Sequence, residues 1–171
     1  MKKVLFTSLF VMVMSISIFA QEIAVPEHVS LPEIEIKTLD GTPFNTPNIQ
    51  NNGKPMMVII WSSYCHPAVA ELDAIADEYY DEWVKRYGVK IYAISIDDSR
   101  TIMRVAPFVQ KKQYPFEVLL DSERSLWKTL KNEAYPVTYI LDGEGKIMWK
   151  HIGYNYDILD IIETKLHKYK E

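Results

Sequence analysis

The feature that most restricts how this chain folds is an uninterrupted apolar run that leads into a helical pattern. Residues Met56–Trp61 read MMVIIW without a polar side chain, which is typical of a central strand covered on both faces. After a short polar segment, apolar residues recur at spacings of three and four, as one helical stripe requires: Val69, Leu72, Ala76, Tyr79, Trp83 and Tyr87. Gly88 then provides a helix end. A buried strand followed by a long amphipathic helix is therefore predicted.

The rest of the chain alternates between the same two kinds of element. Further strands are predicted at residues 34–39, 89–96, 116–120, 136–141 and 146–151, and the Asp142–Gly145 turn makes a hairpin of the last two. Residues 42–55 are rich in Asn, Pro and Gly and are predicted to be a loop.

Three more helices complete the pattern. One is predicted over residues 100–112, capped by Asp97, Asp98 or Ser99, and Pro107 should disturb it. A short helix carries Leu126, Trp127 and Leu130. The last helix is predicted to place five side chains on one face: Ile158, Ile161, Ile162, Leu166 and Tyr169. Strands that alternate with helices predict an α/β fold, with a mixed central sheet flanked by helices. The element order resembles the thioredoxin-like fold, with a strand-helix insertion in the middle.

The first residues read as a targeting segment. Lys2 and Lys3 precede an apolar stretch at 4–19, and Ala20 ends it, which is the layout of a secretory signal peptide. Residues 1–20 are therefore predicted to be a signal peptide cleaved after Ala20, and the protein is predicted to be exported to the periplasm or cell envelope. A membrane anchor is the alternative, although the run is short against the roughly 20 residues of a span. Residues 21–33 are predicted to be a lead-in, and 34–171 a single domain.

Charge and composition exclude several classes of function. The net charge is −4 and becomes more negative without the two N-terminal lysines, so nucleic acid and anionic membranes are poor partners. The chain has no glycine-rich phosphate loop. Its histidines, at positions 28, 66, 151 and 167, lack the spacing of metal ligands. Neither a metal nor another cofactor is expected.

The chain has one cysteine, Cys65, between the buried strand and the long helix. An internal disulfide is impossible, although an exported protein meets an oxidising compartment. Pro67 suits the first turn of a helix, so Cys65 should lie at the helix N-terminus, where the unpaired amides and the helix dipole favour a thiolate. His66 could add a positive charge or a hydrogen bond there. The alternatives are an inert buried cysteine and an exposed histidine without a role.

The segment around Cys65 resembles the active-site segment of thioredoxin-like thiol-disulfide oxidoreductases of the TlpA/ResA type. In these exported reductases of cytochrome c maturation and related thiol chemistry, the segment reads W-x-x-W/Y-C-x-P-C, with a glutamate three residues after the second cysteine. Trp61, Tyr64, Cys65, Pro67 and Glu71 match it. In element order the resemblance extends over residues 30–168.

The resemblance implies roles for several residues. Pro136, in the segment 134–138, matches the cis-proline that faces the cysteine pair, and Glu71 matches the acid that tunes that pair. The alternatives are an ordinary trans proline and a solvated helix acid. The residues expected to line a binding groove are Trp61, Tyr64, His66, Pro67 and Tyr135.

One position departs from the family pattern. Ala68 stands where the family has the second, resolving cysteine. A lone thiolate can attack a partner disulfide, but release of the product normally needs the second thiol. The mixed disulfide at Cys65 should therefore persist until an external thiol cleaves it. Ala68 is either an engineered change or a natural variation.

The leading hypothesis is a disulfide-reductase type of exchange protein in the cell envelope. Its expected partners are protein thiols or disulfides, with a membrane-bound electron donor as a further candidate. The second hypothesis is a non-redox module that binds a protein or peptide in the groove around Cys65. A thiol peroxidase is a third, weaker one, because Ser62 fits its pattern but Val58 stands where that pattern has a proline.

Overall fold

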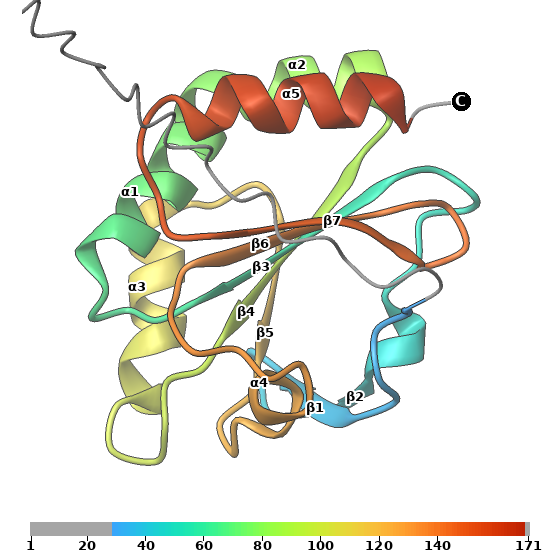
Figure 1. Ribbon diagram of the computed structural model, residues 1–171. Coiled ribbons are helices and arrows are strands. Elements are labelled where there is room, and N and C mark those ends of the chain that lie inside the picture. Colours follow the sequence, from blue (N-terminus) through green and yellow to red (C-terminus); the bar gives the residue numbers. More distant parts are fainter. Residues whose placement is uncertain (1–28, 170–171) are drawn as a thin grey trace, which may run out of the picture.

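The computed structural model describes residues 29–169. The predicted signal peptide at 1–20 and most of the predicted lead-in lie outside the described residues. Seven strands form one mixed sheet in the order β2-β1-β5-β4-β3-β6-β7 (Figure 1). The strands are β1 (Glu35–Thr38), β2 (Pro43–Asn45), β3 (Met56–Trp61), β4 (Lys90–Ser95), β5 (Glu117–Leu120), β6 (Val137–Leu141) and β7 (Ile147–Ile152).

Five α-helices and three shorter helical segments connect these strands. They are α1 (His66–Ala74), η2 (Ile75–Tyr79), α2 (Tyr80–Tyr87), α3 (Val105–Lys112), α4 (Ser125–Thr129) and α5 (Ile158–Lys168), with the 3₁₀ turns η1 (Thr46–Asn48) and η3 (Ile102–Arg104). The predicted α/β class with a mixed sheet is confirmed. None of the helices within residues 29–169 has the length and apolar character needed to cross a membrane.

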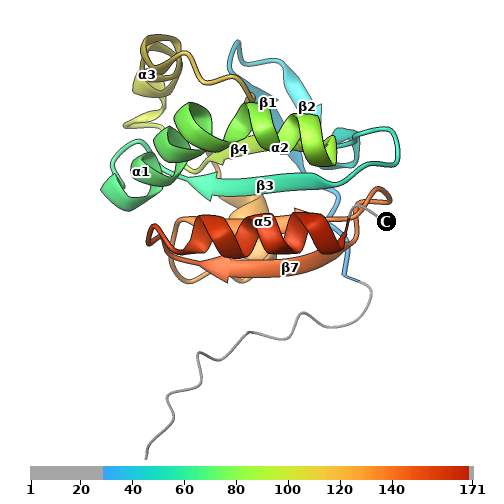
Figure 2. The same ribbon diagram turned by 90° about the horizontal axis from the view of Figure 1, so that it is seen from above.

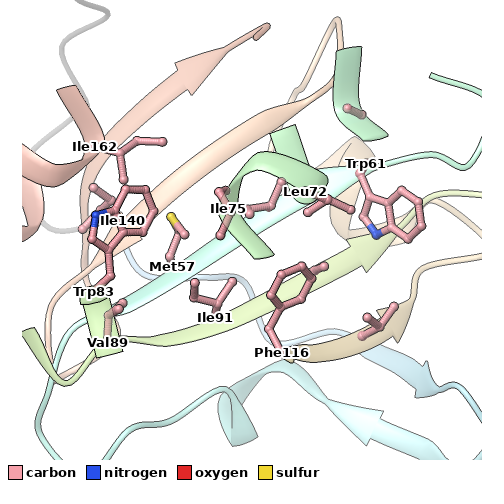
Figure 3. Close-up of a cluster of buried hydrophobic side chains, with 14 of the residues drawn as sticks. Met57, Trp61, Leu72, Ile75, Trp83, Val89, Ile91, Phe116, Ile140 and Ile162 are labelled. Atoms are coloured by element: carbon pink, nitrogen blue, oxygen red, sulfur yellow. The ribbon is translucent and has the colours of Figure 1, made fainter. Parts of the chain in front are cut away.

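The apolar run at β3 is explained by burial on every side. This strand pairs with β4 in parallel and with β6 in antiparallel orientation. Alternate side chains of a strand point to opposite faces, so Met57, Ile59 and Trp61 join one core cluster, while Met56, Val58 and Ile60 join the other. Figure 3 shows Met57 and Trp61 from β3 within the first of these clusters.

The two faces of the sheet are covered unequally. Helices α1, α2, α3 and α5 all contribute to the cluster that contains Met57, whereas α4 and the N-terminal strands contribute to the opposite one. Helices α2 and α5 lie side by side over the sheet (Figures 1 and 2). Glu163 of α5 joins them, because its carboxylate accepts hydrogen bonds from Arg86 and Tyr87 of α2.

The structure differs from the sequence-based elements in three places, although the predicted helix end at Gly88 is confirmed. The predicted loop at 42–55 contains β2 and η1, and β2 pairs with β1 through Phe44 and Ile36. The predicted single helix that ends at Gly88 contains the π-helical segment η2, which inserts a wider turn. The helix predicted over 100–112 becomes regular only at Val105, so that Pro107 lies in its first turn, where a proline removes no helical hydrogen bond.

Helix α5 buries only one of two neighbouring isoleucines that the sequence pattern placed on the same face. Ile162 is fully buried, whereas Ile161 remains 45% exposed. Ile162→Ala should therefore lower the free energy of unfolding by about 2–5 kcal/mol, because it leaves a cavity in the core. Ile161→Ala, the matched control, should cost less than about 1 kcal/mol. Urea unfolding of both variants measures the difference, and equal losses would contradict the described packing.

Candidate active site

Cys65 occupies the position at which β3 passes into α1. It is the residue that caps the N-terminus of α1; its N–H donates to the Ser62 carbonyl (3.0 Å), and its carbonyl accepts from the Val69 N–H (2.9 Å). Helix geometry leaves the N–H groups of His66 and Ala68 without acceptors inside the helix. The thiol is partly exposed, so it combines solvent access with the positive end of a helix dipole.

The second half of the site comes from the loop before β6. The Cys65 Sγ–H donates to the Tyr135 carbonyl oxygen at 3.7 Å, across seventy residues of sequence. The Tyr135–Pro136 peptide bond is cis, and Pro136 is buried. The Pro136 carbonyl accepts from the Gly153 N–H (2.8 Å), which ties this loop to the end of β7. The fold therefore brings Cys65 and Pro136, both singled out in the sequence, to one place.

A buried aspartate that sequence reasoning placed only in a helix cap holds the loop before Cys65. The Asp97 carboxylate accepts from the Ser63 N–H (2.8 Å), the Ser63 hydroxyl (2.7 Å) and the Ser95 hydroxyl (2.8 Å). Asp97 is 1% exposed and follows β4, the parallel neighbour of β3. Because parallel strands end at one edge of a sheet, a carboxylate directly after β4 was the available signal for this contact.

Glu71 belongs to α1, and its side chain is buried in the core against β6. One of its carboxylate oxygens accepts a hydrogen bond from the Thr138 hydroxyl (2.5 Å), while Oε2 is buried without a partner among the described residues. Burial raises the pKa of Glu71 to about 7, against the opposing effect of the Thr138 hydrogen bond. Thr138 stands two residues after Pro136, so Glu71 links the helix that Cys65 caps to the strand that follows Pro136.

The surface around the thiol carries only part of the predicted groove. Tyr64 and Tyr135 are 49% and 39% exposed, and His66 and Pro67 are also exposed. The placement of Trp61 in the groove was wrong, because its side chain is completely buried. Trp61 packs instead against the rings of Phe108 (5.9 Å between centroids) and Tyr114 (6.5 Å), which come from α3 and the loop after it.

The position at which the family has its second cysteine is buried in this protein. Ala68 lies in the first turn of α1, its side chain fully buried in the core cluster that also holds Leu72. Within residues 29–169, no three His, Cys, Asp or Glu side chains gather closely enough to hold a metal ion.

Comparison with known proteins gives consistent matches. Residues 29–150 match the family model described as the AhpC/TSA family. The thiol-disulfide oxidoreductase ResA of Bacillus subtilis is 24% identical over 153 residues, which cover 90% of this chain and 79% of that protein.

Solved structures also match. A thioredoxin-like protein from Porphyromonas gingivalis superimposes with a TM-score of 0.72 and 32% identity, over 81% of this chain and 90% of that one. StoA from Bacillus subtilis superimposes with a TM-score of 0.59 and 24% identity, over 77% of this chain and 96% of that one. The thioredoxin-like fold expected from the element order is confirmed.

The raised pKa of Glu71 has a consequence for stability. Between an ordinary value of 4.5 and about 7, the unfolded chain has released this proton while the folded protein retains it. The free energy of unfolding should therefore fall as the pH rises through this window and level off above it. At about 1.4 kcal/mol for each pH unit, the loss from this group is at most roughly 3 kcal/mol.

Glu71→Gln should remove this pH dependence, because the amide does not titrate. Urea unfolding at intervals across the window, with Glu35→Gln at an exposed strand position as control, measures the effect. The Glu35 variant should keep the slope of the parent protein. If Glu71→Gln kept it as well, Glu71 would not hold its proton in the folded state.

Proposed function

This chain belongs to the AhpC/TSA family, and we propose that it is a thiol-disulfide exchange protein whose single nucleophile is Cys65. The observation that carries the proposal is the contact of the Cys65 thiol with the carbonyl of Tyr135, at the start of the cis peptide bond to Pro136. The Cys65 sulfur is partly exposed at a helix N-terminus, and it lies beside a loop that an extended partner could contact. The thiol-disulfide oxidoreductase activity named for ResA supports the proposal.

The first chemical step needs only Cys65. Its thiolate attacks one sulfur of a partner disulfide, a new S–S bond forms between Cys65 and that sulfur, and the other partner sulfur leaves as a thiolate. The leaving thiolate takes up the proton that Cys65 has lost, directly or through solvent. One disulfide is exchanged for another, so no oxidant or reductant is consumed.

The second step needs a thiol from another molecule, because Ala68 provides no resolving thiol. An external thiol attacks the mixed disulfide, regenerates the Cys65 thiolate and leaves as a disulfide with the bound partner half. The methyl group of Ala68, in the first turn of α1, is fully buried. The site is therefore proposed to capture partners and to release them at a rate set by external thiols.

Glu71 is proposed to act as a positioning residue behind the thiol. Its hydrogen bond to Thr138 joins α1 to β6, the two elements whose ends meet at Cys65. With a pKa of about 7 it can hold or give up a proton near neutral pH. Tyr64, His66, Pro67 and Tyr135 are exposed and are proposed to contact the partner.

The proposed location is the cell envelope, and the proposed partners are protein thiols or disulfides there, with a membrane-bound electron donor as a candidate reductant. The basic and apolar N-terminal segment supports export. Such a compartment offers disulfides as substrates.

The stoichiometry of a single reaction tests the mechanism. The reduced protein is mixed with excess of a peptide dimer joined by one disulfide, without any other thiol, and the released thiol is counted. One thiol per protein should leave, while the other peptide stays on Cys65. Ala68→Cys should release two, because the new thiol resolves the intermediate, and Cys65→Ser should release none.

The same experiment separates the alternatives. A non-redox binding module would retain the peptide in the Cys65→Ser variant and release no thiol in any variant. A thiol peroxidase would instead oxidise Cys65 faster with hydrogen peroxide than with the peptide disulfide. Either outcome would overturn the proposed function.

A further inference from the structure

The arginines of this chain are concentrated near Cys65. Of the four arginines in the sequence, Arg100, Arg104 and Arg124 lie on the segments that follow β4 and β5. These strands run parallel to one another, and β4 runs parallel to β3, so the segments after them leave the sheet at the edge where Cys65 lies (Figure 1). The fourth, Arg86, lies on α2 and pairs with Glu82 and Glu163.

Arg104 contacts the residue next to the nucleophile. Its guanidinium carbon lies 5.4 Å from the centre of the Tyr64 ring. Within residues 29–169, no carboxylate is at ion-pair distance from it. A guanidinium that stacks on an aromatic face keeps the N–H groups at its edge free for a bidentate contact with a carboxylate.

Arg100 adds a second exposed guanidinium on the segment that follows β4. Its side chain is 83% exposed and pairs with Asp98 at 2.8 Å. Asp98 is shared with Arg124, 3.7 Å away, so one carboxylate serves two arginines. Arg124 also donates to the Ile96 carbonyl and has the exposed Glu123 as its neighbour in sequence, so its guanidinium is already engaged within the protein.

Two further acidic groups at this edge are buried and already occupied. Asp97 accepts hydrogen bonds from Ser63 and Ser95. Asp121 accepts from the N–H groups of Ser125 and Trp127. Both are at most 2% exposed, so neither carboxylate competes with a ligand for Arg104.

An apolar side chain completes this surface. Met103, between the two arginines in sequence, is 82% exposed, the most of any large hydrophobic side chain in residues 29–169. We name Tyr64, Arg100, Met103 and Arg104 the arginine rim. An exposed thioether beside the Arg104 guanidinium, which has no ion-pair partner within residues 29–169, fits a protein surface that carries both an acidic and an apolar side chain.

We propose that the arginine rim selects protein partners that carry an acidic side chain next to the reacting disulfide. This inference rests on the proposed exchange reaction at Cys65 and adds the chemistry of its preferred substrate. The protein as a whole is acidic, with a net charge of −4, so long-range attraction does not draw in such a partner. The selectivity must come from local contacts at the rim.

Two matched peptides test the rim. Each has a central cysteine joined by a disulfide to the chromophore thionitrobenzoate, with glutamates beside the cysteine in one peptide and lysines in the other. The release of the chromophore gives the rate constant of attack by Cys65. An exposed ion pair contributes up to about 1 kcal/mol, so we expect the glutamate peptide to react about three- to fivefold faster, a ratio that decreases at high salt.

Substitutions of the arginines show which residues cause the preference for the glutamate peptide. The double variant Arg100→Gln, Arg104→Gln should bring the ratio of the two rates close to one, and Arg104→Glu should reverse it. Arg86→Gln, the matched control at the distant arginine, should leave the ratio unchanged. Alkylation of Cys65 by neutral iodoacetamide should proceed equally in all of them, which shows that the nucleophile itself is intact.

The outcomes are distinguishable. Equal rates for the two peptides with the parent protein, or a preference that survives the double variant, would overturn the role of the rim and leave the exchange reaction standing. Failure of both peptides to react with Cys65 would overturn the proposed function itself.

Discussion

The two-sided pairing of β3 is the constraint on which the rest of the structure depends. This strand has hydrogen-bonded neighbours on both edges and buried side chains on both faces, so its direction and register are fixed by the whole core. Cys65 follows it by four residues, and the turn between them is anchored to the end of β4 through Asp97. A rigid strand, a buried carboxylate and a helix N-terminus together hold one sulfur at the surface.

The same arrangement explains why distant segments meet at the thiol. Since β6 is the antiparallel partner of β3, the loop that enters β6 lies beside the loop that leaves β3, and Tyr135 comes to Cys65. Glu71 accepts a hydrogen bond from Thr138 in the core, so the helix that Cys65 caps and the strand that follows Pro136 are joined there. A buried carboxyl group near neutral pKa costs stability, which is consistent with a role at the site.

The sequence predicted those features that depend on local pattern. The buried strand, the start of the helix at Cys65 and the closing hairpin follow from runs of apolar residues, from Pro67 and from a turn. Features that depend on tertiary packing were missed. Asp97 looked like a helix cap, Trp61 looked like part of a groove, and Ile161 looked buried, because each assignment required knowing which element covers that side chain. The cluster of arginines was equally invisible, since Arg104 meets Tyr64 only once β3 and β4 lie side by side.

The central claim is that the site can form a mixed disulfide but has no internal means of resolving it. It is tested by preparing the protein with glutathione attached to Cys65 and following the loss of this adduct by intact mass at increasing concentrations of an external thiol. The account predicts a rate that rises linearly with thiol concentration and extrapolates to zero in its absence. A finite rate at zero external thiol, with the free Cys65 thiol regenerated, would contradict it.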